Sequence, residues 1–555
     1  MSGIAEGWVR WPDPVAEGYR SRGWWAGTRL ETVIAARARE QPDATAVTDP
    51  SGRWSNARLA GAVERRAAGF AGTGLVAGDR VIVQLPNDAE FLVTFLGLLR
   101  LGVAPVLALP ALRTAELVHL AETTDAVGYV APAAHLGTDH RVLADELRER
   151  CPGVRQVFLA GADGGPGTTP LADVDAAPLD LPARGADEIA FFLLSGGTTG
   201  LPKVIARTHD DYLHNLRHSA AAAGLAPGEV FLAVLSVCHN FTLGCPGVLG
   251  TLWTGGSVVL GGPRSPDECA DLLAPHGVSY TAVTPPTVAG WLDRVAERGV
   301  TAPALRAVQV GAAKLTPRLA DRIRAELGAA VQQSFGMSEG LLLQTTSGDP
   351  HAIARETQGV PVSPGDEIRL VDADDVDVPD GTEGHLLVRG PYTIRGYYRA
   401  PDHDRSAFTD DGFYRSGDLA VRRPDGRYVV TGRAKDVVNR GGEIVSAAEV
   451  EEHLRRHPGV RDAAVVAVPD ERLGERTCAV VVPEPGAPPP RLPVLRRHLR
   501  ERGVAPFKWP DTVRVVPDLP RTALGKTDKT ALRAGLARPR RTQGDPCSST
   551  GPTTT

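Results

Sequence analysis

Lysine is scarce in this sequence, cysteines are few and scattered, and long apolar runs are missing. The six cysteines form no CxxC pair, which argues against a zinc site or a disulfide framework and is typical of a reducing cytosol. No apolar stretch approaches the roughly 20 residues that a membrane helix needs. The first residues, MSGIAEGWVRWPDP, lack the apolar core of a signal peptide. We therefore expect a cytoplasmic protein that does not cross a membrane.

A strong excess of one charge is also missing. The formal net charge is −5 and the isoelectric point is near 6.3, so the composition offers no electrostatic footprint for nucleic acid or an anionic membrane. Only six of the 61 basic residues are lysines. Since arginine serves wherever a generic positive charge is enough, we expect a compact ammonium to be needed at Lys203, Lys435 and Lys526.

Helical and strand patterns alternate along most of the chain. Short apolar runs such as Ile189–Leu194, 230–235 and Tyr280–Val283 are separated by amphipathic segments such as 57–72. Nearly continuous apolar strands separated by helices predict an α/β fold with mostly parallel sheets that are covered on both faces. From about Glu367 the strands become short and are separated by Gly/Pro turns, which predicts a small β-subdomain.

The pattern changes again near residues 432–436. Beyond this point, helices and strands over 447–516 predict a small α+β unit. We expect three parts: an N-terminal core at 1–434, a C-terminal domain at 435–536 and a disordered tail at 537–555. The tail is polar and rich in proline, glycine and threonine.

One apolar strand runs directly into a loop rich in glycine and hydroxyl residues, LSGGTTGLPK at 194–203. Backbone N–H groups and hydroxyls in such a loop wrap phosphate oxygens, and the closing lysine adds a positive charge. The spacing of a Walker A loop is absent. The expected phosphate-binding residues are Ser195, Gly196, Gly197, Thr198, Thr199, Gly200 and Lys203.

Further motifs follow in order: FGMSE at 335–339, YRSGD at 414–418, GRAKD at 432–436 with RGGE at 440–443, and LGK at 524–526. Together with the phosphate loop they resemble the adenylate-forming superfamily, which includes acyl-CoA synthetases, nonribosomal adenylation domains and luciferases. The resemblance covers residues 5–535. It implies an enzyme that uses ATP and Mg²⁺ to convert a carboxylic acid into an acyl-adenylate.

The resemblance also implies roles at the ATP site. Glu339 would ligate Mg²⁺, since a hard cation prefers carboxylate and phosphate oxygens. Asp418 would accept hydrogen bonds from both ribose hydroxyls. The other ATP-binding residues would be Phe335, stacked on adenine, Gly336, Arg433 and Gly311, although Ala312 stands where the family more often has a second glycine.

Lys526 is implied to be catalytic. An ammonium near the acid and the bridging oxygen stabilises the charge that builds as the carboxylate attacks the α-phosphate. In the family, a small mobile C-terminal domain rotates about a hinge, which matches Lys435 here, between two half-reactions. Lys526 would lie in the site for the first and leave it for the second, in which a thiol attacks the adenylate.

The acid pocket resembles that of stand-alone aryl-acid-AMP ligases of siderophore assembly. SVCHNFTLGCPG at 236–247, an N-terminal WPDPVAEGYRSRGWWAG and THDDY at 208–212 carry the resemblance. It implies that Asn240 bonds an ortho hydroxyl and that His239 is both catalytic and acid-binding. No carboxylate lies between residues 231 and 247 to pair with an ammonium, which argues against an amino-acid substrate. The implied aryl-acid-binding residues are His239, Asn240, Cys245, Gly311 and Leu342.

Cys245 and Leu342 narrow the choice of acid. Dihydroxybenzoate-specific enzymes tend to carry Ser and Val at these positions. A thiol donates hydrogen bonds poorly, and leucine adds a methylene where a 3-hydroxyl would sit, at a cost of roughly 1–3 kcal/mol. Salicylate is therefore the expected substrate. The alternatives are 2,3-dihydroxybenzoate, methylated salicylates, anthranilate-like acids and hydroxypicolinate.

The acceptor of the acyl group is expected to be a second molecule. No G-[GH]-[DH]-S-L phosphopantetheine attachment site follows Lys526. The expected acceptor is the phosphopantetheine thiol of an aryl carrier protein in trans, with free CoA as the alternative. A non-catalytic small-molecule-binding protein on the same fold is the alternative from another class. We expect a monomer or a homodimer.

Overall fold

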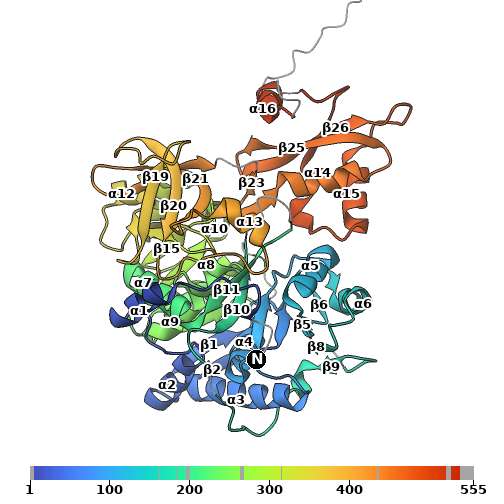
Figure 1. Cartoon of the computed structure of the whole chain (residues 1–555). Coiled ribbons are helices and arrows are strands. Elements are labelled where there is room, and N and C mark those ends of the chain that lie inside the picture. Colours follow the sequence, from blue (N-terminus) through green and yellow to red (C-terminus); the bar gives the residue numbers. More distant parts are fainter. Residues whose placement is uncertain are drawn as a thin grey trace, which may run out of the picture.

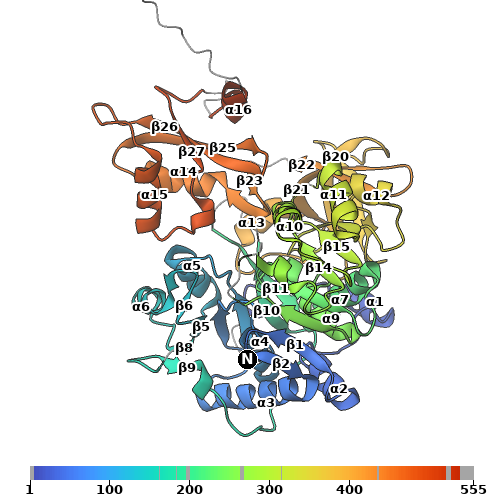
Figure 2. The same ribbon diagram turned by 180° about the vertical axis from the view of Figure 1, so that it is seen from behind.

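The computed structural model of the chain describes residues 5–537, except for residues 162, 183, 196–200, 263–264, 266–267, 314, 434–436 and 521–526. Two large sheets and their helices form the main body, a smaller four-stranded sheet adjoins it, and a separate unit lies at the C-terminal end (Figures 1 and 2). This arrangement confirms the predicted fold class of a large α/β domain with a small β-subdomain and a small α+β C-terminal domain.

Seven strands build the first large sheet, in the order β11–β10–β4–β3–β5–β8–β9. Neighbouring strands are parallel, except that β10 and β11 form an antiparallel pair. The strands are β3 (Arg80–Val83), β4 (Ala104–Leu107), β5 (Gly128–Pro132), β8 (Gln156–Ala160), β9 (Thr169–Pro170), β10 (Ile189–Leu194) and β11 (Val204–Thr208). Helices α5 (Thr114–Thr124) and α6 (His140–Arg150) cover its outer face.

Nine strands build the second large sheet, in the order β18–β17–β16–β15–β14–β12–β13–β1–β2. It is parallel from β1 to β16 and antiparallel at both edges. The strands are β1 (Thr45–Asp49), β2 (Gly52–Ser55), β12 (Val230–Ala233), β13 (Ser257–Leu260), β14 (Tyr280–Val283), β15 (Ala307–Val310), β16 (Ala330–Gly336), β17 (Leu342–Gln344) and β18 (Val360–Pro361). Helices α10 (Pro285–Arg298) and α11 (Pro317–Leu327) cover the outer face.

The largest hydrophobic core lies between the two sheets. Side chains alternate along each strand, so Phe191 of β10 points into this core while Phe192 joins the cluster on the outer face. Helix α4 (Ala89–Leu101) is apolar almost all round and almost wholly buried there, as expected for a helix enclosed on every side. Further helices that contribute to this core include α2 (Thr32–Glu40), α3 (Asn56–Gly72), α7 (His209–Ala223), α8 (Asn240–Gly244) and α9 (Gly247–Thr254).

The β-subdomain is an antiparallel sheet in the order β19–β20–β21–β22. Its strands are β19 (Glu367–Val371), β20 (Glu383–Arg389), β21 (Tyr414–Arg422) and β22 (Tyr428–Arg433). The remaining strands and α-helices described before residue 434 are α1 (Asp13–Ser21), β6 (Ala134–His135), β7 (Thr138–Asp139), α12 (His351–Glu356) and α13 (Pro401–Ala407).

The C-terminal unit is a five-stranded sheet, ordered β24–β23–β26–β25 with β27 also paired to β26. Its elements are β23 (Val437–Arg440), β24 (Glu443–Ser446), α14 (Ala447–Arg455), β25 (Val460–Asp470), β26 (Gly474–Pro483), α15 (Leu492–Glu501), β27 (Thr512–Val515) and α16 (Lys529–Ala537). Helix α16 packs on β25, at the end of the unit that lies away from the main body in Figures 1 and 2.

Most predicted elements are confirmed, with shifts of a few residues at their ends. Strand β12 ends earlier than predicted, and hydrogen bonds from Asn87 explain the difference. The apolar pattern predicts a strand over 230–235, but β12 ends at Ala233. The Asn87 amide donates hydrogen bonds to the carbonyls of Ala233 and Leu235, at 3.2 and 2.8 Å, and its oxygen accepts from Val237 N at 2.9 Å. These bonds turn the chain out of the sheet and lead it toward Asn240.

A buried lysine joins the C-terminal unit to the main body. Lys508 Nζ lies 2.7 Å from Glu449 of α14 and 3.0 Å from Glu116 of α5. Burial alone would lower the pKa of Lys508, but the two carboxylates outweigh it and raise this pKa. A second contact runs from Asn439 Nδ2 to Ala312 O at 2.8 Å. These bonds hold the β23–β24 turn beside the carboxyl ends of the nine-stranded sheet.

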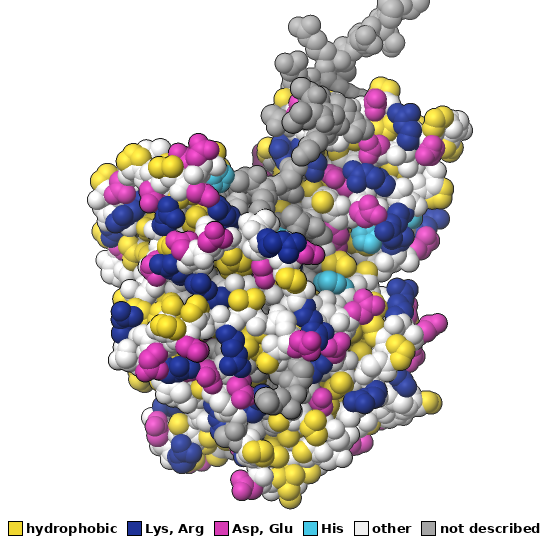
Figure 3. Space-filling view, in the orientation of Figure 1, with side chains coloured by type: hydrophobic (Ala, Val, Ile, Leu, Met, Phe, Trp, Pro, Cys, Tyr) yellow, Lys and Arg dark blue, Asp and Glu magenta, His cyan; other side chains and the backbone are white. Residues whose placement is uncertain are grey.

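The surface carries no obvious patch of one charge on the face seen in Figure 3, where basic and acidic side chains are interspersed. Among the described residues, no helix combines the length and apolar character needed to pass through a bilayer.

Candidate active site

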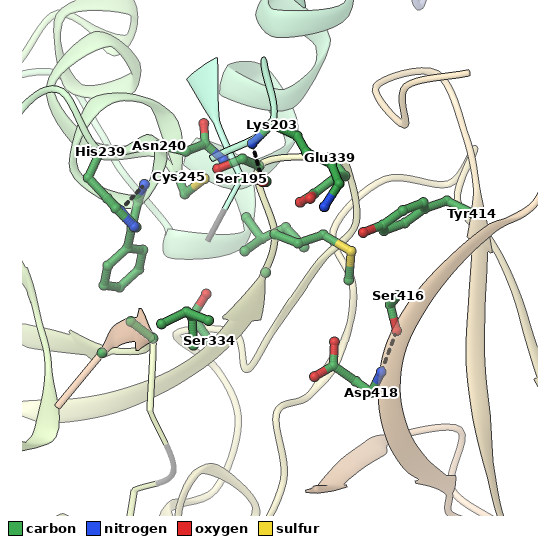
Figure 4. A pocket seen from close by; sticks show the side chains of 18 of the residues that line it. Ser195, Lys203, His239, Asn240, Cys245, Ser334, Glu339, Tyr414, Ser416 and Asp418 are labelled. Atoms are coloured by element: carbon green, nitrogen blue, oxygen red, sulfur yellow. Dashed lines mark hydrogen bonds between the residues drawn. The ribbon is translucent and has the colours of Figure 1, made fainter. Parts of the chain in front are cut away.

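A cavity opens where the carboxyl ends of the nine-stranded sheet, the base of the phosphate loop and the β23–β24 turn meet (Figure 4). The predicted site residues that line it are Ser195, Lys203, His239, Asn240, Cys245, Gly336, Glu339, Leu342 and Asp418. The predicted site residues Gly196, Gly197, Thr198, Thr199, Gly200, Lys435 and Lys526 lie outside the described residues, as does the side chain of Arg433.

The two ends of the phosphate loop are joined to each other. Ser195 N donates to the Lys203 carbonyl at 2.9 Å, and Lys203 N donates to Ser195 Oγ at 3.0 Å. These bonds continue the antiparallel pairing of β10 and β11. The Lys203 ammonium lies 5.6 Å from the centre of the Tyr397 ring, so it is directed toward the cavity. The base of the loop is therefore fixed by strand pairing.

Glu339 is held by Tyr397, which in turn bonds Tyr414, and the motifs gave neither tyrosine a role. The Tyr397 hydroxyl donates to Glu339 Oε1 at 2.6 Å and lies 2.8 Å from the Tyr414 hydroxyl. Burial, followed by the Glu339 charge, raises the pKa of Tyr397 well above its usual value, so its hydroxyl stays protonated. One carboxylate oxygen is thus fixed by the protein, and the carboxylate faces the cavity in Figure 4.

Arg207 supports the segment that carries Glu339. This fully buried guanidinium on β11 donates to Asp211 Oδ1 at 3.1 Å and to the Ser338 carbonyl at 3.0 Å. Burial raises the pKa of Asp211 to about 6, although Arg207 opposes the shift. Thr208 N also donates to Asp211 in the capping box that begins α7. One buried ion pair therefore connects the phosphate-loop strand, α7 and the Glu339 segment.

Asp418 lies on the opposite side of the cavity from the phosphate loop (Figure 4). It is 3% exposed, and its N–H donates to Ser416 Oγ at 3.0 Å, while Ser416 Oγ donates to the Leu386 carbonyl. In the sheet it pairs with Arg433 of β22. The pairing of β21 with β22 therefore places the backbones of Asp418 and Arg433, both predicted to bind the ribose end of ATP, next to each other.

Phe335 and Gly311 do not line the cavity. Phe335 is half-buried and packs against the central core, whereas Met337 of the same motif does face the cavity. A Cβ on Gly311 would lie 2.9 Å from the Phe241 ring and 3.0 Å from the Ser334 carbonyl. Gly311 is needed for this close approach, which lets Ala312 beside it, at φ 63°, line the cavity.

The predicted acid side of the cavity is formed by residues 239–245, which follow the turn that the Asn87 side chain holds. His239 Nδ1 accepts a hydrogen bond from Phe241 N at 3.2 Å and so caps α8. Burial lowers the pKa of His239 to about 4. The imidazole is therefore neutral near pH 7, with its proton on Nε2, and it offers a donor to the cavity. Asn240 and Cys245, at the two ends of α8, line the same wall.

Leu342 of β17 lines the same cavity, where the sequence predicts that it meets the acid. Its side chain is 2% exposed and lies next to Gly336, where a Cβ would come within 2.8 Å of Leu342 Cδ1. Leu342 N donates to the Tyr392 hydroxyl at 3.0 Å, and Tyr392 donates to Asp366 Oδ2 at 2.8 Å. Burial raises the pKa of Asp366 to about 8. This buried chain fixes the backbone that carries the predicted selectivity residue.

A second cavity shares part of its lining with the first, including Ser195, His239 and Asn240. It runs between the main body and the C-terminal unit. Its other lining residues are Leu107, Leu109, Leu112, Leu193, Leu194, Pro202, Cys238, Ser338, Gly442, Glu443, Ile444, Glu449, Phe507 and Lys508. The predicted acid-binding wall can thus be approached from two directions.

Comparison with known proteins identifies the class. The AMP-binding enzyme family matches residues 34–398, and the AMP-binding enzyme C-terminal domain matches residues 449–526. The chain therefore belongs to the AMP-binding enzymes, which confirms the adenylate-forming superfamily predicted from the motifs.

Within this family the chain groups with aryl-acid-AMP ligases. It is 44% identical to the 2,3-dihydroxybenzoate-AMP ligase of Bacillus subtilis, over 96% of this chain and 98% of that protein. It is also 44% identical to the salicyl-AMP ligase / salicyl-S-ArCP synthetase of Mycobacterium tuberculosis, over 95% and 94%. The apo structure of MbtA from Mycobacterium smegmatis superposes with a TM-score of 0.75 at 45% identity, covering 96% of this chain and 100% of that chain.

Sequence reasoning missed the residues that support the site. Arg207 interrupts an apolar strand with a charge, and that signal alone could have marked it as a buried ion-pair partner. Tyr414 opens the YRSGD motif, but nothing local indicates that Tyr397 bonds Glu339 or that Tyr414 bonds Tyr397. The partners of Tyr397 lie 58 and 17 residues away, at Glu339 and Tyr414, and only folding brings the three side chains together.

We predict that His239→Asn reduces the sensitivity of folding to acid. Asparagine keeps a capping acceptor for Phe241 N but does not titrate. The folded pKa of His239 is lowered from 6.5 to about 4. The unfolded chain therefore binds more protons between these values, and stability falls as the pH drops through this window. The measurement is the thermal midpoint at pH 7 and pH 5.

The wild-type midpoint should fall more than that of His239→Asn over this interval. Equal falls in the two proteins would show that His239 is not held neutral by burial. His498→Asn, which changes a histidine of the C-terminal unit outside both cavities, is the control and should behave like the wild type in the same comparison.

Proposed function

We propose that this chain activates salicylate with ATP, forming salicyl-AMP and pyrophosphate, and then transfers the salicyl group to the phosphopantetheine thiol of a separate aryl carrier protein. The observation that carries the proposal is one cavity in which Asn240, Cys245 and Leu342 adjoin Glu339 and Asp418. The first three form an acid pocket without a carboxylate, and the last two provide the acidic groups expected to hold Mg²⁺ and the ribose of ATP.

The cavity suits ATP with Mg²⁺. Ser195, Lys203 and the phosphate loop between them would bind the phosphates, Asp418 and Arg433 would bind the ribose end, and Gly336 would lie beside the nucleotide. Among the described residues, no group of three or more His, Cys, Asp or Glu side chains could hold a metal by itself. A cation at Glu339 would therefore share its ligands with ATP phosphate oxygens, and bound there it would offset their charge.

The acid would lie between α8 and β17. Asn240 would bond the ortho hydroxyl of the acid. The neutral His239 would donate a hydrogen bond from Nε2 to the carboxylate of the acid or to the α-phosphate that this carboxylate attacks. Leu342 and Cys245 favour a ring without a 3-hydroxyl, because leucine crowds that position and a thiol stabilises a polar group poorly. Known relatives act on both salicylate and 2,3-dihydroxybenzoate, so these side chains, rather than overall identity, carry the choice.

The arrangement of the C-terminal unit suits the second half-reaction. The β23–β24 turn lines the cavity, whereas α16, which follows Lys526 in the sequence, packs on β25 away from the main body. We infer that rotation about a hinge at Lys435, with a domain boundary at 434/435, brings Lys526 to the cavity for adenylation. There its ammonium would stabilise the charge that develops at the α-phosphate.

The second cavity offers a path for the acceptor thiol. It reaches His239 and Asn240 from between Leu109 and Phe507, so a long flexible arm could meet the adenylate there. The thiol sulfur would attack the acyl carbon and release AMP. Free CoA remains the alternative donor of such an arm. An acyl-carrier route fits a cytoplasmic monomer or homodimer that supplies siderophore or nonribosomal peptide assembly.

We predict that salicylate exceeds 2,3-dihydroxybenzoate in kcat/KM when acid-dependent exchange of pyrophosphate into ATP is measured. Leu342→Val removes one methylene at the expected 3-position, so the ratio should move toward the dihydroxy acid by about tenfold. Leu343→Val is the matched control, because Leu343 is buried on the same strand but does not line the cavity. A wild-type enzyme that prefers the dihydroxy acid would refute the assignment of salicylate.

We predict that Glu116 and Lys526 affect different half-reactions. Lys526→Ala should slow pyrophosphate exchange by about 10²–10³, the usual effect of losing one charge-stabilising group. Glu116→Gln should leave exchange essentially unchanged and slow transfer to a holo carrier protein. The reason is that Glu116 pairs with Lys508 in the present arrangement, while Lys508 keeps Glu449 of its own unit.

The two rates are measured separately. Pyrophosphate exchange reports adenylation, and the thioester formed in a single turnover from preformed adenylate reports transfer. Glu122→Gln, an exposed change on the same helix, is the control and should alter neither rate. Equal losses of exchange and transfer in Glu116→Gln would contradict the assignment of this arrangement to the second half-reaction. Thioester formed with CoA but not with the carrier protein would overturn the proposed acceptor.

A further inference from the structure

Helix α7 holds both ends of the short helix α8, which forms the acid wall. The Tyr212 hydroxyl donates to Asn240 Oδ1 at 2.9 Å, at the start of α8. One turn further along α7, Asn215 Nδ2 donates to the Gly244 carbonyl at 2.7 Å, at the end of α8. Both bonds are buried, so Asn240 is positioned by a helix that does not itself line the cavity.

The Tyr212 ring has little freedom to move. It is fully buried, and it packs edge-on against Phe191 with ring centres 4.8 Å apart and planes at 88°. The Arg207 guanidinium lies 5.4 Å from the ring centre on β11. A Cβ on Gly244 would come within 2.3 Å of the Tyr212 hydroxyl, so the glycine makes room for that oxygen. The hydroxyl is therefore held at one place beside Asn240.

This placement decides which way the Asn240 amide faces. Burial raises the pKa of Tyr212 well above its usual value, so the hydroxyl keeps its proton and acts as a donor. Within the described part of the chain, the Tyr212 hydroxyl donates its proton to Asn240 Oδ1. Turning the amide over would leave a buried hydroxyl without an acceptor, which is costly. The oxygen is thus committed to Tyr212, and the NH₂ group is left to face the cavity.

We propose that Tyr212 is a positioning residue that fixes Asn240 as a hydrogen-bond donor, so that the pocket selects acids whose 2-substituent is an acceptor. This inference rests on the proposed function, in which Asn240 meets the ortho group of an aryl acid. It separates two of the acids that the sequence leaves open, the 2-hydroxy and the 2-amino benzoates.

The chemistry of the two acids explains the selection. In salicylate the phenolic proton bonds the neighbouring carboxylate, which leaves an oxygen lone pair in the ring plane to accept from Asn240. In anthranilate one N–H bonds the carboxylate, the second N–H points outward, and the nitrogen lone pair is delocalised into the ring. The outward N–H of anthranilate then faces the NH₂ group of Asn240, and two donors cannot bond each other. Anthranilate therefore lacks the hydrogen bond that salicylate makes with the pocket.

Pyrophosphate exchange with salicylate, anthranilate and benzoate tests the proposal. Tyr212→Phe keeps the ring and removes the hydroxyl, which frees the Asn240 amide to turn. The salicylate-to-anthranilate ratio of kcat/KM should fall by about tenfold, the usual worth of one oriented hydrogen bond. Benzoate has no 2-substituent and should change little, and the KM for ATP should not change.

Tyr280→Phe is the matched control. Tyr280 is equally buried, and its hydroxyl donates to Gln309 Oε1 at 3.0 Å, outside both cavities. This variant suffers the same loss of a buried hydrogen bond, so it should keep the wild-type ratio. An unchanged ratio in Tyr212→Phe, or an equal fall for all three acids, would overturn the proposal and assign Tyr212 a purely structural role.

A second variant tests the same inference with Tyr212 intact. Asn240→Asp would keep one oxygen for Tyr212 and turn an acceptor toward the cavity. Anthranilate should then gain on salicylate, and no gain would count against the proposal. Wild-type exchange with salicylate tests the proposed function separately. If the wild type shows no exchange with salicylate, the proposed function is wrong. If the wild type does show exchange and Tyr212→Phe keeps the salicylate-to-anthranilate ratio, only the proposed role of Tyr212 is wrong.

Discussion

The buried ion pair between Arg207 and Asp211 connects the parts of the site that must act together. Arg207 lies on the strand that leaves the phosphate loop, and its second bond goes to the Ser338 carbonyl beside Glu339. Asp211 lies in the first turn of α7, the helix that carries Tyr212. Removing either charge would leave the other buried without its partner, which is strongly destabilising. The two bonds of Arg207 therefore fix the predicted nucleotide side and the predicted acid side relative to each other.

The contact between the main body and the C-terminal unit, unlike the Arg207–Asp211 pair, joins two parts of the chain that each have their own core. Lys508 bonds a carboxylate from each side of the boundary, so one bond is internal to the unit and the other depends on its placement. The same placement brings the β23–β24 turn to the first cavity and creates the second. A charged, hydrogen-bonded contact of this kind can be exchanged for water, which would suit the proposed rotation of the unit, whereas an apolar interface of the same size resists such exchange.

Much of the fold could be predicted because the local signals agreed with one another. Apolar runs separated by amphipathic segments gave the strands and helices of both large sheets, and Asn87 explains the misplaced end of β12 through bonds to a segment more than 140 residues away. The cavity-lining residues Glu339, Asp418 and Asn240 were found because each lies in a recognisable motif. Phe335 and Gly311 were expected at the cavity but support it from behind, since a motif does not specify which way each side chain faces.

The sequence by itself determined the family and predicted the chemistry: a phosphate loop, a carboxylate for the metal, a carboxylate for the ribose and an acid pocket without a counter-charge for an amino group. Only the tertiary structure decided how these groups are oriented. Tyr212 lies 28 residues from Asn240, and Tyr397 lies 58 residues from Glu339, yet each hydroxyl commits one oxygen of its partner. Hydrogen bonds are directional and act over about 3 Å, so the proton that each partner presents depends on atoms that only folding brings together.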